Sequence, residues 1–215
     1  MDSGQLINGL ILYLGLLVLL TFHEFGHAWM AWKCGDDTAH SQGRVSLNPL
    51  VHIDLIGTVV LPLLMIFVAP AGFFVGWAKP VPVDPDNLRN PKTDDIMVTL
   101  AGPWMNLLLA VAIMAIARVG LSIHAAGLYE VSLNLAHLSL LLCFFNLLPI
   151  PPLDGSQVVR SLIGMSYETY HQIARYGMFI LILVLQVPAV QRTLDAVTTK
   201  SWLAIGGWFG MPLLT

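Results

Sequence analysis

The sequence has few charged residues and few cysteines, and it contains no cluster of basic side chains. Only 11% of its 215 residues are charged, whereas 56% are hydrophobic, and the formal net charge is -3. Such a chain offers no cationic surface to a phosphate backbone, so we expect no nucleic-acid partner. Its two cysteines lie in separate segments. Neither a disulfide framework nor a cysteine-based zinc site is therefore expected.

Long apolar stretches dominate what is present, and the mean hydropathy is +0.75. A helix needs about 20 mostly apolar residues to cross a bilayer. We find five such stretches, at residues 6–31, 55–77, 96–118, 131–149 and 173–190. The sequence therefore predicts an all-α polytopic membrane protein that forms one domain over residues 1–215. A final stretch, Trp202 to Leu214, is too short to cross and is expected to lie at the membrane interface.

Two polar loops separate the first three expected spans. Residues 33–54 include a short alternating piece from Gly43 to Leu47, and the loop AKPVPVDPDNLRNPKTDD is punctuated by proline. Alternation and proline-bounded extended segments favour strands over helices. We therefore expect short strands at the membrane edge, near Gly43–Leu47 and Pro80–Val83.

The first span carries the clearest chemical motif of the chain. It places His23, Glu24 and His27 together, in the order HEFGH, after a long run without charge. Residues i and i+4 share one face of a helix, so both imidazoles can bind one metal ion while Glu24 lies beside it. Inserting a charged side chain into a membrane segment costs about 2.5–3.5 kcal/mol. A chance cluster of three ionisable side chains is therefore disfavoured there, and a bound metal ion would compensate the cost. The pattern predicts a catalytic zinc site.

Catalytic zinc takes three protein ligands and leaves one position for water. The best candidate for the third ligand is Asp154, because Pro149, Pro151 and Pro152 end the preceding helix and return the chain toward the bundle. An equally weighted alternative makes Asp154 the N-cap of a following helix, with Gln157 completing a capping box. Three further residues are lesser alternatives as ligands: His52, Asp54 and His137.

Four segments together resemble the site-2 protease family, and the resemblance covers nearly the whole chain. HEFGH at 23–27 matches the family's HExxH, and the residues from Asn146 to Gly155 match its NxxPxxxLDG element. The stretches from Gly43 to Thr58 and from Leu100 to Asn106 are similar to two segments of its short members. No PDZ or CBS domain accompanies these motifs.

The resemblance implies an intramembrane zinc metalloprotease with one Zn²⁺ per chain, bound by His23, His27 and Asp154, and with Glu24 as the general base. It also implies a core made of the first, third and fourth spans. Its substrates would be membrane-anchored proteins or signal-peptide remnants, cleaved within or near their transmembrane helices. A multi-pass location in a prokaryotic cell membrane is implied in the same way.

Two asparagines lie at membrane depth beside these motifs. Asn106 and Asn146 could each donate a hydrogen bond to the oxyanion or to substrate backbone, or they could join helices to one another. We favour the functional role for Asn146 and leave Asn106 open. Gly102 is expected to permit close approach between helices, or a kink at Pro103.

Substrate access requires an unwound peptide and a wet cavity. We expect the strand edges near Gly43–Leu47 and Pro80–Val83 to pair with the unwound peptide.

Two other functions are less consistent with the sequence. A zinc transporter would distribute its ligands along a path, whereas these gather at one depth. A catalytically silent binder of membrane helices would lack Glu24 or a ligand.

Overall fold

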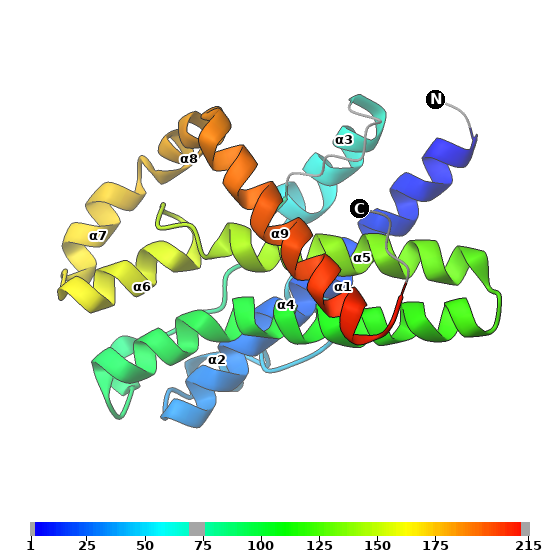
Figure 1. The fold of residues 1–215 in the computed structure, drawn as a ribbon. Coiled ribbons are helices and arrows are strands. Elements are labelled where there is room, and N and C mark those ends of the chain that lie inside the picture. The colour runs from blue at the N-terminus through cyan, green and yellow to red at the C-terminus, as the bar shows by residue number, and fades with distance from the viewer. Residues whose placement is uncertain (1–2, 69–75, 212–215) are drawn as a thin grey trace.

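The computed structural model describes residues 3–68 and 76–211, which are entirely helical apart from turns and loops (Figure 1). The elements, in chain order, are α1 (Ser3–Cys34), α2 (Thr38–Ser41), η1 (Pro49–Val51), η2 (Leu55–Val60), α3 (Leu61–Val68), η3 (Pro85–Asn87), α4 (Pro91–Ser122), α5 (Ala126–Asn146), α6 (Asp154–Ile163), α7 (Tyr167–Ala174), α8 (Gly177–Leu185) and α9 (Pro188–Trp208). The fold class is thus helical, as predicted, and the expected membrane-edge strands are absent from the described ranges.

Three long helices form the centre of the fold. Helices α1, α4 and α5 are each long and apolar enough to cross a membrane, judged by length and composition. They correspond to the first, third and fourth predicted spans. Many of their large apolar side chains are exposed, such as Leu14, Val18 and Trp104, which is 61% exposed. An apolar exterior of this kind suits a lipid environment, in which backbone groups must be satisfied within helices.

Helices α4 and α5 form an antiparallel hairpin that supplies the largest core. Figure 1 shows them side by side, with α1 crossing behind them and α9 crossing in front. The turn between them uses His124 in the left-handed region, with φ 58°. The interface is filled by small or flexible side chains, which let the two backbones approach closely. The buried residues of this cluster are Ala110, Met114, Ala117, Ala136, Leu140, Ile205 and Met211.

The span predicted at residues 173–190 is broken in the structure. Helix α8 ends at Leu185, and α9 starts at Pro188 with an axis bent by 81° from that of α8. Proline is well tolerated in the first turn of a helix but cannot continue one, so the chain breaks here. The pair can make a fourth span only if the two helices are counted together. Helix α9 includes Trp202 and packs on α5, where the indole donates to the carbonyl of Leu133 at 3.1 Å.

The span predicted at residues 55–77 lies partly outside the described residues, which omit 69–75. Its described part contains the π-helical turn η2 and the short helix α3. Asp54 starts η2, since its carboxylate accepts the amide hydrogens of Ile56 and Gly57 at 3.1 and 2.7 Å. Over the described residues, this apolar segment is too short to cross a bilayer alone.

Residues 76–90, called the strap here, include η3 and lead into α4 without forming a strand. The Trp77 amide donates to Gly57, and the Lys79 amide donates to His52. The guanidinium of Arg44 donates to the carbonyls of Lys79 and Pro80 at 2.7 and 3.3 Å. The two segments predicted as strands are therefore joined by a side chain rather than by a ladder of backbone hydrogen bonds.

The fully buried Asp36 anchors the C-terminal half of the strap. Its carboxylate accepts the amide hydrogen of Asp84 at 2.8 Å and the side-chain amide of Asn87 at 3.2 Å. The same carboxylate accepts two hydrogen bonds from Thr38. Burial alone would raise the pKa of Asp36, but these hydrogen bonds outweigh it and lower the pKa below its usual range.

Replacing Asp36 by Asn should destabilise the folded protein by about 1.5–3 kcal/mol, because charge-assisted hydrogen bonds are lost. A lowered pKa means that the wild type keeps this stabilisation above about pH 4 and loses it as the pH falls further. Thermal unfolding in detergent across this range measures the effect. Asp37→Asn is the control, since Asp37 is exposed and pairs only with His40. Parallel pH profiles for wild type and Asp36→Asn would contradict this assignment.

Candidate active site

Helix α1 brings both histidines of the HEFGH motif to the face that packs on α4. His23 is buried, and the side chain of His27 is only 12% exposed. The helices meet closely here because Gly26 faces the backbone of α4. A Cβ on Gly26 would lie 2.7 Å from the carbonyl oxygen of Ala101. The glycine inside the motif therefore lets the two imidazoles reach the interior of the bundle.

Asp154 reaches the same place from a different element. Helix α5 ends at Asn146, and the proline-rich turn that follows leads to α6, whose first residue is Asp154. The N-cap position of α6 is occupied by Leu153, and no side-chain hydrogen bond caps this end. The capping-box alternative with Gln157 is therefore wrong. The carboxylate is instead free to face α1.

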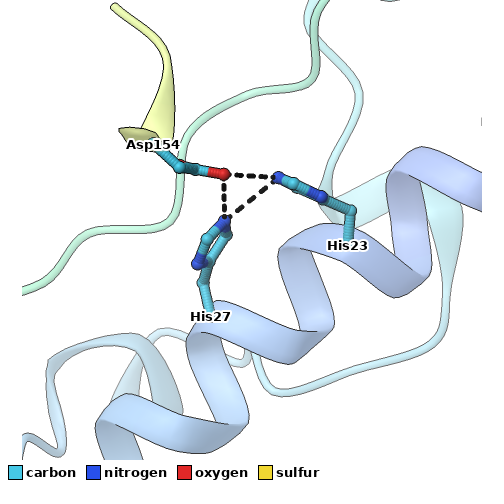
Figure 2. Close-up of side chains that lie close together, drawn as sticks. All are labelled: His23, His27 and Asp154. Carbon is cyan, nitrogen blue, oxygen red and sulfur yellow. Dashed lines mark hydrogen bonds and ion pairs between the residues drawn. The ribbon is translucent and has the colours of Figure 1, made fainter. Parts of the chain in front are cut away.

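His23, His27 and Asp154 converge on one point (Figure 2). The Nε2 atoms of the two imidazoles are 3.1 Å apart. Oδ2 of Asp154 lies 3.3 Å from Nε2 of His23 and 3.5 Å from Nε2 of His27. Within the described ranges, no other group of three such side chains with this spacing occurs.

These distances fit three ligands of a tetrahedral zinc ion. With zinc–ligand bonds of about 2.0–2.1 Å, neighbouring ligand atoms in a tetrahedron are about 3.3 Å apart. The donor set of two imidazoles and one carboxylate is also one that zinc accepts. Oδ2 of Asp154 is buried and makes no hydrogen bond, so its close contacts are the two imidazole nitrogens. The residues present thus fit a zinc ion.

The charge of Asp154 is stabilised by its neighbours. Burial alone would raise the pKa of this carboxyl group. The attraction of His27, together with the interactions of both imidazoles, outweighs burial and lowers the pKa well below its usual range. Asp154 is therefore ionised at neutral pH, as a metal ligand has to be.

Helix α4 contacts the far side of both imidazoles. Nδ1 of His27 lies 2.8 Å from the carbonyl oxygen of Val98, to which it can only donate. In the neutral imidazole that binds a metal, this bond places the proton on Nδ1 and leaves Nε2 as the ligand atom. Nδ1 of His23 lies 3.1 Å from the side-chain amide of Asn106. The atom of Asn106 that faces Nδ1 is the amide nitrogen, and the amide oxygen has no partner. If His23 binds a metal through Nε2, turning this amide by 180° lets Nδ1 donate to the amide oxygen.

Glu24 lines the same cavity as the three candidate ligands. The cavity has a volume of about 770 Å³. Oε2 of Glu24 accepts the amide hydrogen of Val81 at 3.1 Å, so the strap fixes one carboxylate oxygen. The polar side chains on the cavity wall include Asp95, Asn146, Gln157, Tyr167 and His171.

The three alternative ligands have other partners. His52 donates from Nε2 to the carbonyl of Ser46 at 2.8 Å, and burial lowers its pKa. Asp54 starts η2, and His137 lies against the ring of Trp202 on α9. None of them joins the group formed by His23, His27 and Asp154.

The predicted asparagines differ in their positions. Asn106 is fully buried behind His23, and its backbone carbonyl accepts the hydroxyl of Ser139 at 2.7 Å. Asn146 lines the cavity, and its side-chain amide donates to the carbonyl of Leu142 at 3.0 Å. Of the two, only Asn146 faces the space in which a substrate could lie.

Fold and site together define a helical protein with three or four candidate membrane spans and a group of three side chains that could hold a metal ion, two of them on its first long helix. The chain belongs to peptidase family M50, the zinc metalloproteases that include the site-2 proteases, which it matches over residues 11–123 and 118–185. Membership confirms the family predicted from the sequence motifs.

Individual relatives agree with this assignment. The chain is 39% identical to YwhC of Bacillus subtilis (strain 168), with 82% of this chain and 80% of the relative aligned. It is 33% identical to Rip2 of Mycolicibacterium smegmatis, covering 83% of this chain and 67% of that one. A more distant relative is MJ0392 of Methanocaldococcus jannaschii, at 21% identity over 73% of this chain and 35% of that one. Each of the three carries the words zinc metalloprotease in its name. No solved structure is significantly similar to the chain.

Gly102 has a direct role at the site that sequence patterns did not reveal. A Cβ at this position would lie 2.3 Å from Nε2 of His27 and 2.7 Å from Cε1 of His23. Real Cβ atoms essentially never make such contacts, so any other residue would displace the imidazoles. The prediction that Gly102 permits a close approach between helices is confirmed. The absence of a side chain at Gly102 also leaves room for the two imidazoles of α1.

Gly102→Ala should therefore weaken zinc binding by about 10–100-fold, the range found when groups behind metal ligands are changed. Competition with a chelator of known affinity, combined with zinc analysis of the purified protein, measures this. Gly127→Ala is the matched control, because its Cβ would meet nothing within 4 Å. Wild-type zinc affinity in Gly102→Ala would refute the packing argument.

Proposed function

We propose that this protein is an intramembrane zinc metalloprotease, which hydrolyses peptide bonds within or near the transmembrane helices of membrane-anchored proteins. One observation carries the proposal. Three candidate zinc ligands and Glu24 line one cavity, and two of the ligands lie on a helix long and apolar enough to cross a membrane. Membership in peptidase family M50 supports the same reaction class.

His23, His27 and Asp154 would hold one Zn²⁺ per chain. Zinc, when bound, supplies a Lewis acid that lowers the pKa of a coordinated water to about 7. Glu24 then acts as the general base: it accepts a proton from the attacking water and delivers it to the nitrogen of the leaving amine. The hydrogen bond from the Val81 amide orients Glu24 for both transfers, since it holds one oxygen and leaves the other free.

Hydrolysis in a bilayer also needs water near the scissile bond. The polar lining of the cavity favours hydration, because side chains on its wall such as Gln157 and His171 can hold water. A zinc transporter would need such groups along a path through the membrane. The ligands of this chain instead meet at one point, which favours hydrolysis over transport.

The substrate class and location follow from the family resemblance. We propose that transmembrane proteins or signal-peptide remnants are the substrates, and that the enzyme acts as a single domain over residues 1–215 in a prokaryotic cell membrane. The relatives YwhC and Rip2 are bacterial proteins, which supports this location.

Cleavage of a single-span substrate with a Gly/Pro-weakened helix tests the proposal directly. The purified protein in detergent should cleave it inside the span, and Glu24→Gln should lower the rate at least about 10²-fold while keeping one zinc per chain. Mass spectrometry of the products locates the cleaved bond. His23→Ala should lose both zinc and cleavage. Equal cleavage by wild type and Glu24→Gln would exclude Glu24 as the base.

The two asparagines should respond differently to substitution. Because Asn106 contacts His23 rather than the cavity, we propose that it positions this ligand, and Asn106→Ala should lower zinc affinity about 10–100-fold. Asn146→Ala should keep zinc affinity and lower kcat, as expected for a donor to substrate or oxyanion. Chelator competition and steady-state kinetics on both variants separate the two roles. A normal zinc affinity in Asn106→Ala would exclude its positioning role.

A further inference from the structure

One face of the N-terminal half of α4 contacts the surroundings of the candidate metal site. Val98 accepts a hydrogen bond from His27, Gly102 leaves room for both imidazoles, and Asn106 meets His23. Asp95, one turn before Val98, lies on the same face, because the spacings of three, four and four residues follow the helical repeat. Unlike the hydrogen bonds of Val98 and Asn106, the side-chain hydrogen bonds of Asp95 do not go to an imidazole of α1.

Asp95 contacts α6 and α7 instead. Its Oδ2 accepts hydrogen bonds from the guanidinium of Arg160 and the hydroxyl of Ser161, both on α6. Its Oδ1 accepts the hydroxyl of Tyr167 at 2.6 Å. Arg160 also lies over the Tyr167 ring, with Cζ 3.6 Å from the ring centroid. Asp95 and Arg160 are each only 5% exposed, so this is a buried ion pair.

Helix α6 needs an interaction that fixes its position on α4, because it is short and its first residue is the third candidate ligand. It has ten residues, starts at Asp154 directly after a proline-rich turn, and holds Arg160 six residues further on. Exposed apolar side chains, such as Leu162 and Ile163, cover much of its outer surface. A short helix with little buried apolar area can slide or rotate, whereas a buried ion pair with several hydrogen bonds fixes one register.

We propose that Asp95 and Arg160 are positioning residues for the metal site, which fix α6 on α4 so that Asp154 meets His23 and His27. Helix α4 then places all three ligands: His27 through Val98, His23 through Asn106, and Asp154 through the ion pair. This inference rests on the proposed zinc site. It assigns a role to a charged pair that the hydrolytic mechanism itself does not use.

The double variant Asp95→Asn with Arg160→Met tests this without leaving a lone buried charge. Replacing both members of a buried pair often changes stability little. We expect the double variant to unfold near the wild-type temperature but to bind zinc about 10–100-fold more weakly, as when ligand-supporting groups are lost. The visible absorption of the Co²⁺-substituted protein should also change, because it reports ligand geometry.

Asp94→Asn is the matched control. Asp94 is the adjacent residue, is also buried, and accepts the amide hydrogen of Asn90 at 2.8 Å, so its carboxylate caps the start of α4. This variant should unfold at a lower temperature while keeping the zinc affinity and Co²⁺ spectrum of the wild type. If the double variant does not fold, Arg160→Lys replaces it, since lysine keeps the charge but loses the planar fork. We then expect a folded protein with reduced zinc affinity.

The Asp154→Ala background shows whether the pair acts through this ligand. There, adding the double substitution should cause no further loss of affinity. A further loss, or wild-type affinity and spectrum in the double variant or in Arg160→Lys, would overturn the inference. The proposed function fails separately: in that case wild type would not bind one zinc, or His23→Ala would bind it as well as wild type does.

Discussion

The structure depends on the close contact between α1 and α4 at the metal site. Lipid gives helices no hydrophobic reason to associate, so close packing of small residues has to hold them. Gly26 meets the backbone of α4, and Gly102 meets the imidazoles of α1. Without these two glycines the helices would separate, and His23 and His27 would lose the groups on α4 that orient them.

Buried polar side chains around the candidate site form hydrogen bonds and ion pairs with partners from distant parts of the chain. Glu24 accepts a hydrogen bond from the strap, and Asp36 anchors the strap near its other end. Asp95 and Arg160 neutralise one another between α4 and α6. Because an unpaired polar group costs much in an apolar interior, each of these contacts fixes a segment as well as a charge.

Sequence patterns predicted the long helices well, because a continuous apolar run identifies them. They predicted the strands less well, because a strand depends on a partner strand elsewhere in the chain. The long apolar runs identified α1, α4 and α5, although the bend at Pro188 divided the last predicted span into α8 and α9. The alternation at Gly43–Leu47 suggested a strand, but a strand forms only against another strand. The guanidinium of Arg44 took the carbonyl groups that such a ladder would have used.

The sequence by itself determined that the two imidazoles lie together with Glu24 beside them. Residues four apart on one helix share a face whatever surrounds them. It also marked Asp154 as a candidate, although spacing alone could not separate a ligand from a helix cap. The tertiary structure places Asp154 with the other two candidate ligands, since only the packing of α6 on α4 brings Oδ2 to the imidazoles. The same is true of Gly102, Asn106 and Asp95, whose contacts join residues far apart in the chain and leave no local pattern in the sequence.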